Sequence, residues 1–302
     1  MTRMNTIAVL GQSFLDRILY VAALPTEPSK MRVVRQLETG GGIASTAAVT
    51  SARLGHITNL YSRLGDDHAG DTIARLLRAN NVDTTGVRRF HNARSPQGTI
   101  VVDPTGERMG FGFMGDGWKN DASWLDLKLE HVRAVLADYS WREGASAIFA
   151  AARERGAASV LDADINDIES VRHLLPRADH VVFSERCLAA VTGCAEPATG
   201  LLEAAKLTNA RVSVTVGERG FYWLEGGRVS HLSAFEVQAI DTNGAGDVFH
   251  GAYTVAVAEG MSVGDAGRFA SATAALKCLK GSGWESIPNR AEVDQFLKGV
   301  VK

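Results

Sequence analysis

The sequence predicts an α/β fold: a central, mostly parallel β-sheet with helices on both faces, extended by a small β-sheet lid. Short apolar runs typical of buried strands alternate with helical patterns along most of the 302 residues, as in sheets whose parallel strands are joined by helices. Two segments rich in Pro and turn residues interrupt this alternation. With 45% hydrophobic residues, the chain can bury one large core, so we expect a single domain over residues 1–302.

The first strands and helices are indicated by apolar runs and by the signals that end them. Thr6–Gly11 is a short apolar run that ends in Gly, which is typical of a buried strand. Ile43–Leu54 is rich in small residues and is followed by Gly55, a good helix stop, and His56–Tyr61 resumes as a strand. Apolar residues at helical spacing over residues 69–77 indicate an amphipathic helix.

The rest of the chain continues the alternation and closes on helices. Strands that are separated by helices enter a sheet in the same direction, which again favours a parallel sheet. The expected elements are Val132–Ala137 with Glu143–Arg155, Ala158–Asp162 with Asp167–Leu175, the strands His180–Phe183 and Arg211–Val216, and the helices Gly246–Glu259, Gly264–Leu279 and Ala291–Val300.

The two interrupting segments are predicted to form one β-flap. Residues 18–38 contain Pro25 and Pro28 between extended stretches, and residues 98–113 contain two extended stretches around a turn at Pro104. Neither segment fits a strand–helix unit. A small sheet over the edge of the main one accounts for both, so we assign them as a β-lid.

Composition excludes several classes of partner and site. The net charge is −2 without a basic run, so we expect no nucleic-acid partner. No stretch reaches the roughly 20 apolar residues of a membrane helix, and the first residues lack a signal peptide, so we expect a cytoplasmic location and no membrane contact. Cys187, Cys194 and Cys278 form no CxxC pair and are expected to be reduced thiols.

The segment DTNGAGD, from Asp241 to Asp247, is the most informative candidate for a catalytic site. Gly244, Ala245 and Gly246 are small residues at a turn into a helix, where backbone N–H groups and the helix dipole attract an anion. Asp247 falls at the start of that helix, where it can accept a proton from an attacking hydroxyl. An Asp at a helix start after a Gly-rich turn is also a common cap, and the motif alone leaves both interpretations open.

Two features near the N-terminus are candidate ligand contacts. Gly40–Gly42 permits close approach of a ligand to the backbone, although a plain strand-to-helix turn needs glycines as well. A dinucleotide loop is disfavoured because Ser45 stands where its third Gly would be. Asp16 lies just past the first strand, where it either accepts hydrogen bonds from two hydroxyls of a polyol or is an exposed loop acid.

A third candidate contact is the turn Thr215–Gly220, between the expected strands Val212–Val216 and Phe221–Leu224. A tight Gly-containing turn at a strand end can contact a nucleotide phosphate. An ordinary hairpin turn fits the local sequence equally well.

Several of these segments together resemble the ribokinase/PfkB family of carbohydrate kinases. DTNGAGD followed by VFHGAY resembles the C-terminal signature of the family, and GGGIASTAAVTSARLG resembles its N-terminal signature. The stretch SRLGDDHAG is similar to the G-x-D-x-x-G segment that follows the latter. The matches occur in family order between Gly11 and Pro288, and several matches in order are far more specific than any one of them.

The resemblance implies a ribokinase-like fold and an ATP-dependent kinase that phosphorylates a small sugar, ketohexose-like or a related polyol. It implies that Asp247 deprotonates the sugar hydroxyl while backbone N–H groups stabilise the transferring phosphoryl group. The residues implied are Gly244, Ala245 and Gly246 for the phosphoryl group, Asp16, Gly41, Gly42 and Thr46 for the sugar, and Thr215, Gly217, Gly220 and Gly283 for ATP.

The resemblance also implies cofactors and an assembly. ATP and Mg²⁺ are expected, and K⁺ is allowed as a third, since Asp241, Asn243 and the loop Gly281–Gly283 lie where family members bind a monovalent cation. The β-lid would close over the sugar and exclude water. Lids of this family often pair between subunits, so a homodimer through the lid is expected.

The chain departs from the family at four positions. Thr46 stands where many ribokinase-like proteins carry Asn, and Ile43 stands where ribokinases carry Lys. In the metal-linked N-x-x-E segment, Ser184 replaces the Asn and Cys187 replaces the Glu. Mg²⁺ must then be held mainly by ATP phosphates and water, or by Glu185 or another acid.

Among the branches of the family, the stretches Asp16–Ile18 and Phe183–Glu185 look similar to the sulfofructose kinases. Lys30 could pair with an anionic head group. A sulfonate pocket should offer a second cation and polar lid donors, but Ser140, Phe111 and Phe113 are poor anion ligands. We therefore favour a neutral polyol, while Arg32, Arg35 and Arg142 could reverse this choice.

Three other functions are weighed against a sugar kinase. A nucleoside kinase of the same fold could stack a base on Phe111, Phe113 or Trp118. A sugar-binding regulator has no need of the base Asp247, and a dehydrogenase is disfavoured by the glycine spacing.

Overall fold

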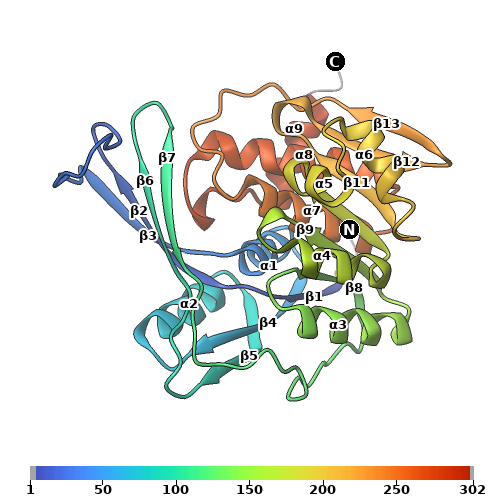
Figure 1. The fold of residues 1–302 in the computed structure, drawn as a ribbon, viewed down its shortest axis with the longest axis horizontal. Coiled ribbons are helices and arrows are strands. Elements are labelled where there is room, and N and C mark those ends of the chain that lie inside the picture. Colours follow the sequence, from blue (N-terminus) through green and yellow to red (C-terminus); the bar gives the residue numbers. More distant parts are fainter. Residues whose placement is uncertain (1–4, 300–302) are drawn as a thin grey trace.

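The computed structural model describes residues 5–299 and contains a nine-stranded sheet and a separate four-stranded sheet (Figure 1). The strands of the large sheet are β1 (Thr6–Leu10), β4 (Ile57–Gly65), β5 (Val82–Phe90), β8 (Val132–Asp138), β9 (Ala158–Ala163), β10 (His180–Ser184), β11 (Arg211–Thr215), β12 (Phe221–Glu225) and β13 (Arg228–Leu232). Their order is β13-β12-β11-β10-β9-β8-β1-β4-β5. All neighbours from β11 to β5 are parallel, whereas β12 and β13 pair antiparallel at one edge.

Helices cover both faces of the large sheet and bury it from both sides. The helices are α1 (Ile43–Arg53), α2 (His68–Ala79), α7 (Ala245–Ala258), α8 (Val263–Lys280) and α9 (Arg290–Gly299) on one face, and α3 (Arg142–Arg155), α4 (Ile168–Leu174), α5 (Glu185–Thr192) and α6 (Pro197–Ala204) on the other. Along β1, Ile7 and Val9 pack toward the first group, and Ala8 and Leu10 pack toward the second. Because side chains alternate along a strand, a sheet buried on both faces needs such a continuous apolar run. The predicted α/β class is confirmed.

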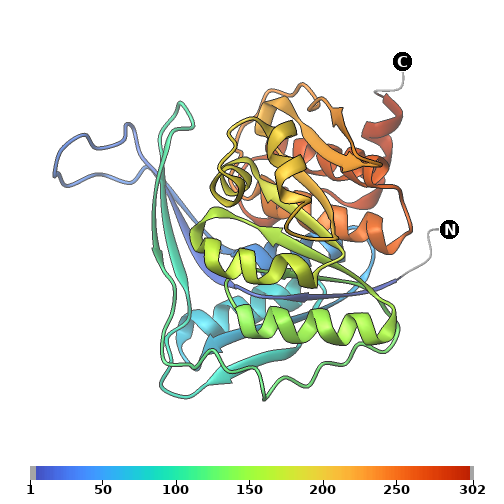
Figure 2. The same ribbon diagram turned by 45° about the vertical axis from the view of Figure 1, so that its right-hand side comes forward.

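The four-stranded sheet, which we call the lid sheet, projects from the main body (Figures 1 and 2). It consists of β2 (Phe14–Tyr20), β3 (Arg35–Gly41), β6 (Gln97–Val102) and β7 (Arg108–Phe113), in the order β3-β2-β6-β7. Both segments that interrupt the strand–helix alternation contribute to it, so the separate small sheet is confirmed. Its closing motion and the single-domain organisation of the chain remain predictions.

Four elements were not predicted from the sequence: β5, β13, α5 and α6. β5 carries polar and partly exposed residues (VDTTGVRRF), because it is the last strand at one edge of the large sheet. An edge strand needs no continuous apolar run, and its register comes from pairing with β4. The α5 and α6 helices are only eight residues each, too short to establish a helical period.

No helix within residues 5–299 is long and apolar enough to cross a bilayer. Cys187 and Cys278 are buried and Cys194 is partly buried, and all three are free thiols.

Candidate active site

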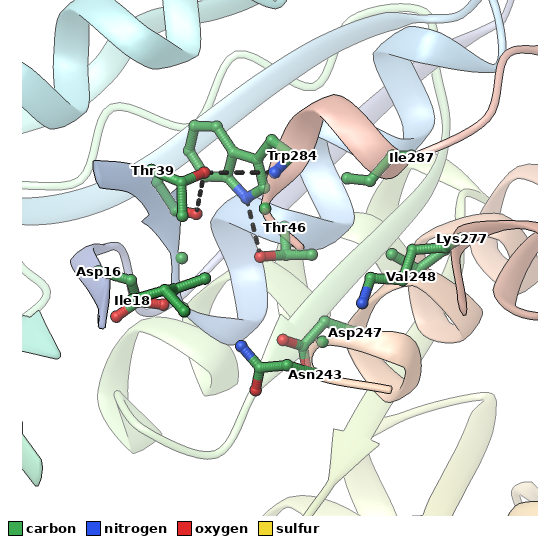
Figure 3. Close-up of a pocket in the computed structure, with 15 residues that line it drawn as sticks. Asp16, Ile18, Thr39, Thr46, Asn243, Asp247, Val248, Lys277, Trp284 and Ile287 are labelled. Carbon is green, nitrogen blue, oxygen red and sulfur yellow. Dashed lines mark hydrogen bonds between the residues drawn. The ribbon is translucent and has the colours of Figure 1, made fainter. Parts of the chain in front are cut away.

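A pocket lies between the base of the lid sheet and the N-terminus of α7. Figure 3 shows Asp16 and Ile18 at one side, and Asn243 and Asp247 at another. The pocket brings together residues from segments far apart in the chain, namely Asp16, Ile18, Thr39, Gly40, Gly41, Gly42, Thr46, Asn243, Gly244, Asp247, Val248, Lys277, Gly283, Trp284 and Ile287. Eight of these were predicted from the sequence as site residues: Asp16, Gly41, Gly42, Thr46, Asn243, Gly244, Asp247 and Gly283.

The first turn of α7 carries the candidate base. Gly244 caps the helix in the left-handed conformation with φ 72°, which a residue with a Cβ rarely adopts. Asp247 lies in this first turn and faces the pocket. The N–H of Ala245 donates to Thr242 O at 3.2 Å, so the N–H groups of Gly244 and Gly246 are the better placed of the three predicted donors to meet an incoming anion.

The environment of Asp247 favours a proton acceptor with unusually high proton affinity. Burial raises the pKa of Asp247 to about 8, and the nearby carboxylates of Asp162, Asp164 and Asp138 add to this effect. The cationic ring of His250 acts in the opposite direction on the pKa of Asp247. A base with a pKa near the working pH combines proton affinity with a useful deprotonated fraction.

His250 lies on α7 itself, one turn after Gly246, and was not recognised from the sequence. Its Nδ1 lies 2.8 Å from Gly246 O and 3.0 Å from Asp162 Oδ2, and its Nε2 lies 3.2 Å from Val182 O. Because both ring nitrogens face acceptors, the ring is a doubly protonated imidazolium. Burial alone would lower the pKa of His250, but the Asp162 carboxylate outweighs it and raises that pKa to about 9. Asp162 Oδ2 has no other partner among the described residues.

Asp16 occupies the opposite wall, on β2 of the lid sheet. It pairs with Thr39 of β3 on one side and with Gly98 of β6 on the other. A Cβ at Gly41 or at Gly98 would overlap the Asp16 carboxylate, so both strands leave room for this one side chain. Burial raises the pKa of Asp16 to about 6.

Trp284 forms an apolar wall of the pocket and was also missed by sequence reasoning. Its Nε1 donates to Thr46 Oγ1 at 3.0 Å and its backbone N–H donates to Thr39 Oγ1 at 3.2 Å (Figure 3). A Cβ at Gly40 would overlap the indole ring. Thr46 lines the same pocket, with its hydroxyl oriented by Trp284.

Asp241 is close to the pocket and is held by several donors. Its Oδ1 accepts the N–H of Asn243 at 2.7 Å, and its Oδ2 accepts the hydroxyl of Ser282. Its carbonyl accepts the Nζ of Lys277 at 3.0 Å, and Lys277 is only 2% exposed. Burial lowers the pKa of Lys277, while Asp241 opposes this effect. Lys277 is the positively charged side chain among the described residues that line the pocket.

The remaining predicted residues lie outside the lining of this pocket. Lys30 is exposed in the loop between β2 and β3. Thr215 is the last residue of β11, and Gly217 and Gly220 come after it, at the edge where the parallel strands end. The aromatic residues Phe111, Phe113 and Trp118 are also absent from the pocket lining.

The segment with the departures from the N-x-x-E pattern has structural partners of its own. Ser184 accepts the N–H of Cys187 as the cap of α5 and donates to Asp164 Oδ1 at 2.7 Å. The thiol of Cys187 is buried, and burial raises its pKa to about 12. Glu185 pairs with Arg219. Cys187 is therefore unsuited to hold Mg²⁺, whereas the half-buried carboxylate of Asp164 lies within hydrogen-bond distance of Ser184 in this segment.

Comparison with known proteins places the chain among phosphoryl-transferring enzymes. Residues 4–290 match the model of the pfkB family carbohydrate kinases. A ribokinase from Haemophilus influenzae is 26% identical over 97% of this chain and 99% of its own length. A solved chain from Agrobacterium tumefaciens, assigned provisionally as a ribokinase, is 31% identical with a TM-score of 0.91, covering 99% of this chain and 100% of that one. Arabidopsis thaliana ribokinase complexed with ribose and ATP is 25% identical with a TM-score of 0.85, covering 98% and 99%.

Proposed function

The chain belongs to the pfkB family of carbohydrate kinases, and from this premise we propose that it transfers the γ-phosphoryl group of ATP to a hydroxyl of a neutral sugar or polyol. The observation that carries the proposal is the pocket that joins Asp247, at the start of α7, to Asp16 on the lid sheet. A base and an anion-binding helix start occupy one wall, and a carboxylate that suits sugar hydroxyls occupies the other.

The geometry supports a direct transfer with Asp247 as the general base. A hydroxyl held between Asp16 and Asp247 would give its proton to Asp247 as it attacks the γ-phosphorus. The N–H groups at the start of α7, chiefly those of Gly244 and Gly246, would stabilise the charge on the transferring group. His250 holds this turn in place, because its ring bonds to Gly246 O from below.

ATP would approach the carboxyl ends of β10 and β11. In this arrangement Thr215, Gly217 and Gly220 contact the nucleotide and Gly283 lies at its boundary with the sugar. Mg²⁺ bound to ATP would neutralise phosphate charge. This ion usually needs one or two protein carboxylates besides phosphates and water. Asp164 fits that requirement, since it is half-buried just after β9 and lies close enough to Asp247 for its charge to raise the Asp247 pKa. A need for ATP also fits the cytoplasmic location expected from the sequence.

Three features of the pocket support a neutral substrate. Lys30, the predicted ligand of an anionic group, is exposed in the β2–β3 loop. The ammonium of Lys277 is engaged with Asp241 O. Trp284, Ile18 and Ile287 present apolar surface suited to the face of a sugar ring.

Two alternatives remain within the same fold. A nucleoside kinase is less well supported, because the aromatic residues expected to stack a base do not line the pocket. A sulfosugar or other anionic sugar is the second candidate, because Lys277 puts one positive charge into the lining.

Exposed apolar side chains on the lid sheet support the homodimer that we propose. β7 is an edge strand and is exposed along its whole length. Phe111 is 60% exposed and Met114 is 55% exposed, and an unpaired apolar edge is a surface that another strand can cover. We expect light scattering after gel filtration to give the mass of two chains, and Phe111→Ser to shift it toward one chain. The mass of a single chain for the unaltered protein would contradict the lid-mediated dimer.

The proposed activity is tested by ADP release from purified protein with Mg·ATP and a panel of neutral pentoses, ketohexoses and polyols, together with sulfosugars, sugar acids and nucleosides. We expect a neutral sugar or polyol to give the highest kcat/KM and a product heavier by one phosphoryl group in mass spectrometry. Asp247→Asn is the control for contaminating kinases. A clear preference for an anionic sugar or a nucleoside would contradict the proposed substrate class, and no turnover with any acceptor would contradict the proposed function.

A further inference from the structure

The surroundings of Asp241 bear on whether this protein needs a monovalent cation. The family resemblance implies such an ion at Asp241, Asn243 and the loop Gly281–Gly283. An ion of this kind is held by carbonyl and carboxylate oxygens that take the place of its hydration shell. The oxygens of Asp241 would therefore have to be available to coordinate the ion.

All three oxygens of Asp241 already accept hydrogen bonds from the protein. Oδ1 accepts the N–H of Asn243 at 2.7 Å, Oδ2 accepts the hydroxyl of Ser282, and the carbonyl accepts Lys277 Nζ at 3.0 Å. A second cationic group, Nη1 of Arg108 in the lid sheet, lies 4.0 Å from Oδ1. This set of donors does not fit a further cation, because the ion would have to displace these donors and lie beside two positive charges.

The positively charged side chain of Lys277 is buried and held in place by a hydrogen bond to Asp241. It lies on α8, is 2% exposed, and lines the same pocket as Asp247 (Figure 3). A buried ammonium is costly unless it has hydrogen-bond partners and a compensating charge. The Asp241 carbonyl and carboxylate supply both, so the lysine and the loop that begins at Asp241 stabilise each other.

We propose that the Lys277 ammonium takes the place of the monovalent cation, so that this kinase works without K⁺. The inference rests on the proposed kinase function. The tethered charge supports the Asp241–Asp247 loop and adds positive potential next to the site of phosphoryl transfer, which is the contribution that a bound ion would make. Because the charge is covalently attached, no ion has to be bound before each turnover.

The test compares initial rates at constant ionic strength in potassium, sodium and tetramethylammonium chloride. We expect the unaltered kinase to show rates within about twofold of one another, since only general screening remains. Lys277→Ala leaves space and removes the charge, so it should lose about tenfold or more without K⁺ and regain activity with K⁺. Lys277→Met is the matched control: it removes the charge but keeps the volume, so K⁺ should not restore it.

A second measurement is independent of turnover. The midpoint of thermal unfolding, measured in potassium against sodium chloride, should show no K⁺-specific rise for the unaltered protein and a rise for Lys277→Ala. Three results would overturn the inference: strong K⁺ activation of the unaltered kinase, no K⁺-specific response of Lys277→Ala in either measurement, or a rise in the sugar KM of Lys277→Ala that is the same at every K⁺ concentration. The last result would make Lys277 a substrate ligand. If no sugar is phosphorylated, the proposed function fails while the unfolding measurement still decides this inference.

Discussion

The two walls of the pocket are built from different kinds of structure. Asp247 stands on α7, a helix packed in the core whose first turn is held from below by His250. Asp16 stands on β2 of the lid sheet, whose outer strand β7 is exposed along its length. The wall with the proposed base thus belongs to a helix packed in the core, and the wall with the proposed sugar ligand belongs to a projecting sheet. Substitutions on the two walls should therefore separate kcat from KM.

The largest effect is expected from Asp247→Asn. The variant keeps the shape of the side chain but cannot accept the proton, so kcat should fall by about 10²–10⁴-fold. Binding of ATP and of the sugar should persist, since neither needs the proton transfer. Calorimetry measures the binding of each ligand, and a coupled rate assay measures the fall in kcat. Turnover close to that of the unaltered enzyme would contradict the role of Asp247.

Thermal unfolding shows whether this variant is correctly folded and also reports on its buried charge. Because the pKa of Asp247 is raised from 3.8 to about 8 in the folded chain, the folded state holds a proton that the unfolded state has lost between these values. Stability then declines as the pH rises through this window. Asp247→Asn should therefore unfold at a higher temperature than the unaltered protein at pH 8, with the difference vanishing below about pH 4.

A smaller effect, on the sugar KM and not on kcat, is expected from Asp16→Asn. Loss of a charged acceptor of hydrogen bonds should cost about 1.5–3 kcal/mol of sugar binding, which is about 10- to 100-fold in kcat/KM. The change should appear mainly in the sugar KM, with the KM for ATP unchanged. Arg17→Gln, at the exposed neighbouring position of β2 that pairs with Glu38 and lies outside the pocket lining, is a control for disturbance of the lid sheet. If Asp16→Asn reduced kcat alone, the division between the two walls would be wrong.

The pH dependence of kcat/KM should reflect the titration of both pocket carboxyl groups, Asp247 and Asp16. The base works when deprotonated, so kcat/KM should rise about tenfold per pH unit below the Asp247 pKa of about 8 and level off above it. Below the Asp16 pKa of about 6, the slope should steepen, because a second carboxylate then needs to lose its proton. Asp16→Asn should abolish only this lower break. A flat profile between pH 6 and pH 9 would argue against Asp247 as the base.

The smallest effect is expected from Lys30→Ala. Lys30 is exposed in the β2–β3 loop and lies outside the pocket lining, so kcat/KM for a neutral sugar should change by less than about twofold. The same variant assayed with a sulfosugar sharpens the comparison, since an anion ligand would reveal itself there. A large loss that is confined to the anionic sugar would show that the loop reaches the site.

Sequence motifs predicted the residues whose role follows from local structure. Gly244 and Asp247 lie where one loop enters α7, and Asp16 lies six residues after the end of the first strand, so short patterns were sufficient to single them out. The alternation of strands and helices likewise predicted the parallel sheet, and its interruptions predicted the lid sheet.

Residues whose role depends on packing between distant segments were missed. Lys277 lies in the last turn of α8, where a lysine is ordinary because it complements the helix dipole. Trp284 acquires its role by bonding to Thr46, 238 residues away. His250 reads as part of a helical pattern until Asp162 of β9 is placed beside it. The available signal was closeness in sequence to a candidate loop, Asp241–Asp247 for His250 and Gly281–Gly283 for the other two. This signal was too weak to distinguish these residues from core or surface residues.

The way the lid sheet is attached makes its outer end move further than its base when the sheet rotates. β3 ends at Gly41 and α1 begins at Ile43, so one residue separates the projecting sheet from a buried helix. Asp16 lies close to this link between β3 and α1. Arg108, which donates to Thr242 at 3.4 Å, lies at the far end of the β6–β7 hairpin. A small rotation about this link would displace Asp16 little and Arg108 much further. We therefore expect that the tip of the hairpin can part from the loop at Thr242 while Asp16 keeps its place in the pocket.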